Sequence, residues 1–288
     1  MTQAPGVLVV DKPSGITSHQ VVGKARRLLG TRKVGHAGTL DPMATGVLIL
    51  GVNRATRLLG RLALHDKRYL ATIRLGESST TDDAEGEVMP VADASGVSLD
   101  DIETAAAEFR GQICQVPSTY SAIKVGGRRA YALARSGTPP ELTARPVTIT
   151  RLDLHQAHPQ GAVLDVTADI ECSSGTYIRS IARDLGQRLG VGGHLISLRR
   201  TRVGGFTLEE AVELGEHAPA LMSMTEAARR SFPCLTLDEA GAADVRHGRR
   251  LAQPVPAAPT AMIDPDGQLL ALYEPSQDGS RPVAVLVG

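Results

Sequence analysis

The chain has 288 residues, of which 42% are hydrophobic and 22% are charged, and its formal net charge is zero. This composition is typical of a soluble globular protein, and no apolar run approaches the roughly 18 residues that a membrane span needs. The three cysteines are odd in number and far apart, which argues against a disulfide framework and a CxxC metal site. The first residues lack the basic segment of a signal peptide, so we expect a cytoplasmic protein.

The charges are segregated along the chain. Up to residue 74 there are 12 basic residues and three acidic ones, whereas residues 77–110 hold ten acids and one base. Residues 179–202 are basic again, with six arginines and one aspartate. A polyanion could bind if the basic blocks share a face, and solvated helix faces that happen to be basic are the alternative interpretation.

Hydrophobic periodicity and capping residues predict the elements of the first 200 residues. In chain order they are a strand at 7–10, a helix capped by Ser18 and ended by Gly30, the loop around Asp41, strands at 46–51 and 67–76, a helix from the capping box of Ser98 and Asp101 through Phe109, a strand at 163–172, and a helix with its buried stripe between Ile178 and Leu189.

The strand at 163–172 alternates clearly, with its apolar side chains on one face and Asp165, Asp169 and Glu171 on the other. We therefore expect a half-buried strand. Strands and helices follow one another without regular βαβ alternation, which favours an α+β fold with a mixed, largely antiparallel sheet and helices packed on it.

The segment after about residue 230 changes character. It contains a short strand at 234–237, a helix near 238–247, a proline-rich connection and a hairpin that turns at "DPDG". We predict two domains, a large one at 1–230 and a small, β-rich one at 231–288.

Asp41 stands alone among small residues in "VGHAGTLDPMATG". Pro42 biases the backbone of Asp41 toward an extended conformation, and the glycines and alanines leave room for another molecule. Two interpretations stand side by side: a carboxylate presented to a ligand, or an ordinary Asp-Pro turn with glycine hinges.

Other residue types give weaker signals. His36 precedes a glycine-rich turn, where histidines are more often structural than catalytic, and the histidines form no HExxH pattern, so we predict no metal. The glycine clusters lack the nucleotide-binding spacings. Aromatic residues make up only 3% of the chain, and Tyr69 and Tyr177 each lie beside an arginine, as a base-stacking platform would. Tyr69 can equally be a core residue of its strand.

Five separated blocks stand out in chain order: "DKPSGITSHQVV", "KVGHAGTLDPMATGVL", "KRYLATIRLG", "QVPSTYSAIKVGGRRAYALAR" and "CSSGTYIRSIARDLG". In this order they resemble the motif series of the bacterial tRNA pseudouridine synthase B family. The resemblance covers residues 7 to about 205, and the C-terminal segment resembles a short, divergent form of the family's PUA-type RNA-binding domain.

The resemblance implies the pseudouridine synthase fold and isomerisation of the T-loop uridine of tRNA, position 55, to pseudouridine, with no cofactor and no metal. Asp41 would be the nucleophile or base, and at pH 7 roughly a thousand such carboxyls are ionised for each protonated one. Arg179 would pair with Asp41 and hold its pKa low. Whether Asp41 attacks the sugar or removes a sugar proton is open at this point.

The same resemblance implies further site residues. His36 would stabilise the flipped arrangement of the RNA, and Tyr69 would stack on the extruded uracil and assist removal of the C5 proton. Tyr177 and Leu198 would line the base pocket, and Asp83 would lie near the active cleft, although Asp82 competes for that place. The expected contacts to the RNA backbone are Lys12, Lys67, Lys124, Arg128 and Arg129.

Two other functions stay open. The chain could be an RNA-binding protein that helps tRNA to fold, or a pseudouridine synthase that acts on another RNA with guide RNA and partner proteins. No heptad and no long exposed apolar face requires a partner chain, so we expect a monomer that acts on the T stem-loop of tRNA without an obligate protein partner.

Overall fold

The computed structural model describes residues 4–287 except 122, 123, 126, 131, 132, 134, 135, 137 and 139. The chain divides into two compact units. The first unit comprises Met1–Pro42, Gly46–Ala63 and Val203–Gly288, and the second comprises Met43–Thr45 and Leu64–Arg202. No helix in the described part of the chain has the length and apolar character that crossing a membrane requires.

The N-terminal part of the first unit is built on β3 (Thr45–Val52), which pairs antiparallel with β1 (Gly6–Lys12) and with β2 (Val34–Ala37). β2 corrects our expectation that this stretch is a loop. The loop around Asp41 is accordingly short and joins two paired strands. It is followed, after β3, by a 3₁₀ helix (Asn53–Leu58) and the single turn α2 (Leu59–Leu62).

Helix α1 (Ser18–Leu28) connects β1 to β2. Its N-cap is Thr17, whose hydroxyl accepts a hydrogen bond from the Gln20 amide, while the Gln20 side chain accepts one from the Thr17 amide. This reciprocal capping box satisfies two amides that a helix start leaves unpaired. The predicted cap, Ser18, is instead the first helical residue, and its hydroxyl binds the backbone of Leu40.

The C-terminal segment forms a four-stranded sheet with the order β14-β15-β16-β17. The predicted hairpin at "DPDG" is present between β15 and β16, where Gly267 has a φ of +83°, a conformation that glycine adopts without strain. The elements are α6 (Met224–Ser231), β14 (Cys234–Thr236), α7 (Glu239–Arg246), β15 (Thr260–Ile263), β16 (Leu269–Ser276) and β17 (Gly279–Val285).

This sheet shares a hydrophobic core with the N-terminal part of the first unit. Leu272 and Leu286 belong to the same buried cluster as Val9 and Leu58. The guanidinium of Arg57 also donates a hydrogen bond of 2.8 Å to the carbonyl of Val285. Residues 231–288 therefore pack on segments that precede residue 63, and the domain boundary near residue 230 stays a prediction.

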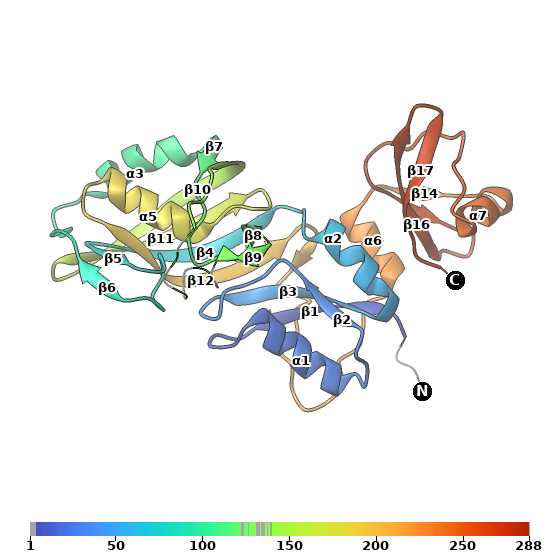
Figure 1. The fold of residues 1–288 in the computed structure, drawn as a ribbon, viewed down its shortest axis with the longest axis horizontal. Coiled ribbons are helices and arrows are strands. Elements are labelled where there is room, and N and C mark those ends of the chain that lie inside the picture. Colours follow the sequence, from blue (N-terminus) through green and yellow to red (C-terminus); the bar gives the residue numbers. More distant parts are fainter. Residues whose placement is uncertain are drawn as a thin grey trace. The chain divides into compact units, whose positions relative to one another are not determined.

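The strands of the second unit are hydrogen-bonded in the order β12-β4-β11-β10-β7, and the pairs β4-β11, β11-β10 and β10-β7 are antiparallel. Helices α3 and α5 contact each other and lie against this sheet (Figure 1). The unit thus confirms the predicted fold class, a mixed and largely antiparallel sheet with packed helices. Its elements are β4 (Lys67–Leu75), β5 (Glu77–Ser79), β6 (Val88–Pro90), α3 (Leu99–Ala106), β7 (Gly111–Gln115), β10 (Arg145–Gln160), β11 (Val163–Cys172), α5 (Ile178–Arg188) and β12 (Gly193–Val203).

Strand β11 has the predicted bounds, but two of its outward carboxylates are buried. Arg74 binds Asp165 through two hydrogen bonds of 2.7 and 2.8 Å, and Arg68 binds Asp169 in the same two-pronged way. Both arginines lie on the neighbouring strand β4. Arg74 is directly opposite Asp165, and Arg68 is two residues from Leu70, the residue opposite Asp169. The polar face of this strand is therefore covered by the stems of long basic side chains rather than by water.

Candidate active site

The Asp41 loop lies between β2 and β3 and carries Asp41 as a partly exposed carboxylate. The backbone amide and carbonyl of the residue before it, Leu40, are both hydrogen-bonded to one hydroxyl. Ser18 Oγ donates a hydrogen bond of 3.0 Å to the Leu40 carbonyl and accepts one of 2.9 Å from the Leu40 amide. Ser18 is only 2% exposed and Leu40 is buried, so this contact is shielded from water. Gly38, with a φ of +77°, provides the turn into the loop.

The residue after Asp41 is held as well. The carbonyl of Pro42 accepts hydrogen bonds from the Gly15 amide at 2.9 Å and from Lys12 Nζ at 3.0 Å. The segment 12–18 therefore grips the chain on both sides of Asp41. The backbone of this aspartate is placed by its neighbours within the same unit.

Lys12 has no exposed surface. Its ammonium donates to three carbonyls, those of Pro13 at 2.8 Å, Ile16 at 2.6 Å and Pro42. We expected this lysine to contact the RNA backbone. In the structure it braces the loop from inside, and its charge is turned toward backbone carbonyls of its own chain.

His36 lies on β2, opposite Leu50 of β3, and is partly exposed. Its ring meets that of His19 edge to face, with the ring centroids 6.3 Å apart and an angle of 86° between the planes. The two histidines come from β2 and from the first turn of α1. The first unit therefore contains a histidine pair in addition to the Asp41 loop. The spacing of 17 residues between the two histidines does not predict their contact.

In the second unit, Tyr69 is on the apolar face of β4 and opposes Ile170 of β11. It is 6% exposed, as both the core and the stacking interpretations allow. Leu198, on β12 beside β4, is also buried. The structure thus places both residues in one sheet, on neighbouring strands.

Arg179 is almost completely buried at the start of α5, with its side chain 5% exposed. Its guanidinium binds the carbonyls of Thr81 at 3.0 Å and Tyr120 at 2.9 Å and lies 3.2 Å from the carboxylate of Asp83. Asp41 belongs to the other unit, so the pairing of Arg179 with Asp41 stays a prediction.

The structure distinguishes the two adjacent acids that sequence left in competition. Asp83 is the buried partner of Arg179, and it also accepts a hydrogen bond from the Glu85 amide. Asp82 has a φ of +61° and pairs instead with Arg183 at 3.1 Å. Burial raises the pKa of the Asp82 carboxyl, against the opposing effect of Arg183. Asp83 is therefore the acid that contacts a predicted catalytic residue.

Tyr177 is the N-cap of α5 and is partly exposed. The side-chain amide of Gln115 makes two hydrogen bonds to the backbone of Tyr177. It donates one of 3.0 Å to the Tyr177 carbonyl and accepts one of 2.8 Å from the Tyr177 amide. Gln115 itself is buried. Gln115 is not among the predicted site residues, because a single glutamine 62 positions away carries no local signal.

The other basic residues that we expected to contact the RNA backbone differ in how far the structure describes their side chains. Lys67 is buried at the start of β4, and its ammonium donates 2.6 Å to the His65 carbonyl. Burial, together with the nearby charge of Arg200, lowers the pKa of Lys67 to about 8. Lys124, Arg128 and Arg129 lie on two short paired strands, β8 (Lys124–Val125) and β9 (Arg128–Arg129), and their side chains lie outside the described part of the structure.

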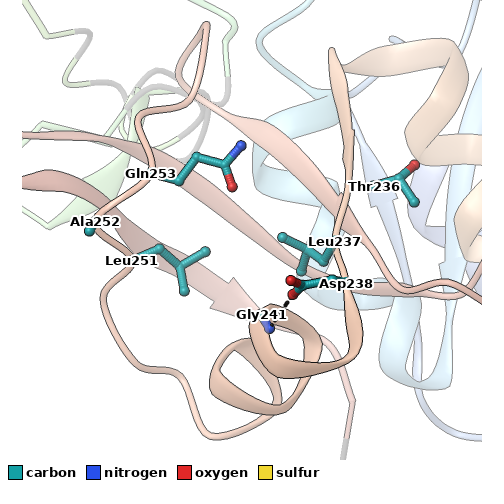
Figure 2. A pocket seen from close by; sticks show the side chains of 7 residues that line it. All are labelled: Thr236, Leu237, Asp238, Gly241, Leu251, Ala252 and Gln253. Carbon is teal, nitrogen blue, oxygen red and sulfur yellow. Dashed lines mark hydrogen bonds between the residues drawn. The ribbon is translucent and has the colours of Figure 1, made fainter.

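A separate cavity of about 330 Å³ lies in the C-terminal segment, at the start of α7 (Figure 2). Leu237 and Leu251 line it together with Asp238, whose carboxylate accepts a hydrogen bond of 2.7 Å from the Gly241 amide. None of its lining residues is among the predicted site residues.

Comparison with known proteins gives three matching family models. Residues 26–178 match the model described as TruB family pseudouridylate synthase, N terminal domain. Residues 179–240 match tRNA pseudouridylate synthase B C-terminal domain, and residues 232–287 match tRNA Pseudouridine synthase II, C terminal. The matches together extend from the helix before the Asp41 loop to the last strand.

Individual relatives agree with these models. The chain is 56% identical to tRNA pseudouridine synthase B of Cutibacterium acnes, over 99% of both chains, and 54% identical to that of Arthrobacter sp. (strain FB24), over 97% of this chain and 96% of the relative. A solved structure titled as a Cbf5-Nop10-Gar1 complex is 28% identical, with a TM-score of 0.71 over 98% of this chain and 84% of that chain. The chain belongs to the TruB family of pseudouridylate synthases.

Proposed function

We propose that this chain is a stand-alone tRNA pseudouridine synthase that isomerises the T-loop uridine, position 55, without guide RNA. The observation that carries the proposal is the Asp41 loop, a partly exposed carboxylate whose two neighbours are held by Ser18 and Lys12. The name of the relatives, tRNA pseudouridine synthase B, supports tRNA as the substrate.

The reaction breaks the bond from N1 of uracil to C1′ of the ribose and forms a bond from C5 to C1′. C5 loses a proton and N1 gains one, so nothing is consumed and the proton count balances. A carboxylate at Asp41 can start this exchange as a nucleophile toward C1′ or as a base toward a sugar proton. Asp41 needs only to be ionised and held in place, and the grip on Leu40 and Pro42 supports the second requirement.

The uridine must leave its stack before it can react, which costs a few kcal/mol. Tyr69 stacks on the extruded uracil, and such stacking is worth about 1 to 3 kcal/mol per base. His36 braces the rearranged loop from β2, and Tyr177 and Leu198 form the wall around the base. The clasp of Gln115 on the Tyr177 backbone supports this assignment, because it fixes the position from which the ring projects.

Arg179 acts on Asp41 from the start of α5 and keeps its carboxyl ionised. The buried contacts with Thr81, Tyr120 and Asp83 support this role, because they hold the guanidinium in a fixed orientation. Asp83 is accordingly a positioning residue for this arginine.

The distribution of charge supports a polyanionic substrate. From residue 24 to residue 65 the chain contains eight arginines and lysines and one acid, Asp41. Arg27, Arg32 and Lys33 are exposed in this stretch. Such a surface attracts phosphates and makes affinity fall with rising salt. In the second unit, the residues that contact the RNA backbone are Lys124, Arg128 and Arg129.

We assign residues 1–230 to the catalytic domain and residues 231–288 to a short PUA-like RNA-binding domain, in a protein that works as a monomer. The test is to incubate the purified chain alone with an unmodified T stem-loop RNA and to look for pseudouridine by nuclease digestion and chromatography. Conversion at the T-loop uridine supports the proposal. RNA binding without conversion favours a tRNA-folding protein, and conversion only with added guide RNA and partners favours another RNA substrate.

A further inference from the structure

Ser18 makes an unusual contact for the first residue of a helix. One hydroxyl serves both backbone groups of a residue 22 positions away, donating to the carbonyl of Leu40 and accepting from its amide. A serine hydroxyl has one proton to donate and two lone pairs, so it can fill both roles at once. Thr17 takes over the capping of α1, which leaves Ser18 free for this contact.

The contact acts on the peptide unit next to Asp41. The carbonyl of Leu40 and the amide nitrogen of Asp41 belong to one planar peptide group, so a fixed oxygen fixes the plane from which the Asp41 Cα projects. On the other side, Pro42 restricts the backbone of Asp41 to extended conformations. Its own carbonyl is held by Gly15 and Lys12. The backbone on both sides of Asp41 is therefore held in place.

We infer that Ser18 is a positioning residue for Asp41, which it holds at the reacting carbon through the Leu40 peptide without touching the RNA. This inference rests on the proposed role of Asp41 as nucleophile or base. A hydroxyl at this position is needed because Leu40 is buried, and without Ser18 its amide and carbonyl would have to find other partners or water by moving the loop. Displacement of a catalytic group by about 1 Å costs on the order of 100-fold in rate.

The matched control is Ser280 of β17. It is also fully buried, and its hydroxyl donates 2.9 Å to the carbonyl of Gln253, so Ser280→Ala removes a hydrogen bond of the same kind far along the chain from the Asp41 loop. Both alanine variants should lose thermal stability. Only Ser18→Ala should lose chemistry, and the difference separates positioning from general loosening of the fold.

The experiment measures single-turnover conversion of a T stem-loop RNA, with enzyme in excess, and RNA affinity by filter binding. We expect Ser18→Ala to lower the rate constant by about 10- to 100-fold with RNA affinity unchanged. Ser18→Cys, which keeps a weak donor and acceptor in a similar volume, should lie between serine and alanine, and it carries the comparison if the alanine variant does not fold.

A rate constant for Ser18→Ala that equals that of Ser280→Ala would overturn the inference, as would a loss confined to RNA affinity. Asp41→Asn is measured in parallel. If Asp41→Asn still converts uridine, the proposed function of Asp41 fails, whereas an inactive Asp41→Asn beside a fully active Ser18→Ala refutes only the positioning role.

Discussion

The guanidinium of Arg179 lies 3.2 Å from the carboxylate of Asp83, and both side chains are almost completely buried. The adjacent acid, Asp82, binds Arg183 instead, and that arginine has a second acidic partner in Asp184 at 2.8 Å. Two consecutive aspartates thus form ion pairs with different arginines. One neutralises a buried arginine, and the other belongs to a partly exposed group of three charges.

Asp83→Asn should destabilise the protein strongly. The substitution removes the carboxylate that lies 3.2 Å from the guanidinium of Arg179 in a buried site, and the loss of one partner of a buried ion pair costs about 3 to 5 kcal/mol. Asp82→Asn is the control, because Arg183 keeps Asp184. Urea unfolding of both variants measures the difference in free energy, and equal losses would contradict the assignment of Asp83 to Arg179.

The stability of the free protein should depend on Lys67 at alkaline pH. Its pKa is lowered from 10.5 to about 8 in the folded chain, so between these values the unfolded chain binds more protons and the contribution of Lys67 to stability rises with pH. That contribution is lost as pH falls toward 8. Subtraction of the unfolding free energies of Lys67→Met from those of the wild type should show this rise, and a flat difference would mean an ordinary lysine.

Two helical glycines should respond in opposite ways to alanine. A Cβ at Gly186 of α5 would lie 2.2 Å from the backbone of Gly192, so the helix could not approach that turn, and overpacking of this kind costs about 1 to 3 kcal/mol. A Cβ at Gly23 of α1 meets nothing within 4 Å. Gly23→Ala should therefore stabilise by about 0.5 to 1 kcal/mol. Thermal unfolding of the two variants checks the sign of each effect.

Tyr69 should contribute to RNA affinity through its ring. Tyr69→Phe keeps an aromatic face and should bind the T stem-loop as the wild type does, whereas Tyr69→Leu should lose about 1 to 3 kcal/mol of binding free energy. Filter binding with both variants measures this. If leucine binds the RNA as well as phenylalanine does, the ring is a core residue of β4 and does not stack on the base. If phenylalanine weakens binding as much as leucine does, the hydroxyl and not the ring makes the contribution.

Much of the fold could be predicted because it is written in local patterns. The alternation of residues 163–172 gave the bounds of β11, and the capping box of Ser98 with Asp101 gave the start of α3. The burial of Asp165 could not be predicted in this way. It depends on Arg74 from another strand, and a period of two along one strand says nothing of a partner 91 residues away.

The candidate site shows the same division. Asp41 and its small neighbours can be found in sequence because the signal is contiguous. The roles of Ser18 and Gln115 could not be found, since each binds the backbone of a distant residue, and a backbone contact leaves no mark on the identity of its partner. For Ser18 the local signal was even misleading, because serine is a common N-cap and Thr17 stands beside it.

The proposed role of Asp41 is tested most directly by single-turnover release of tritium from C5 of the T-loop uridine in a labelled T stem-loop RNA. The measurement compares the wild type with Asp41→Asn, at RNA concentrations where both bind equally. The wild type should release tritium without guide RNA, and Asp41→Asn should release none above background while it retains RNA affinity. Release by Asp41→Asn at a rate near that of the wild type would contradict this role and make Asp41 an ordinary turn residue.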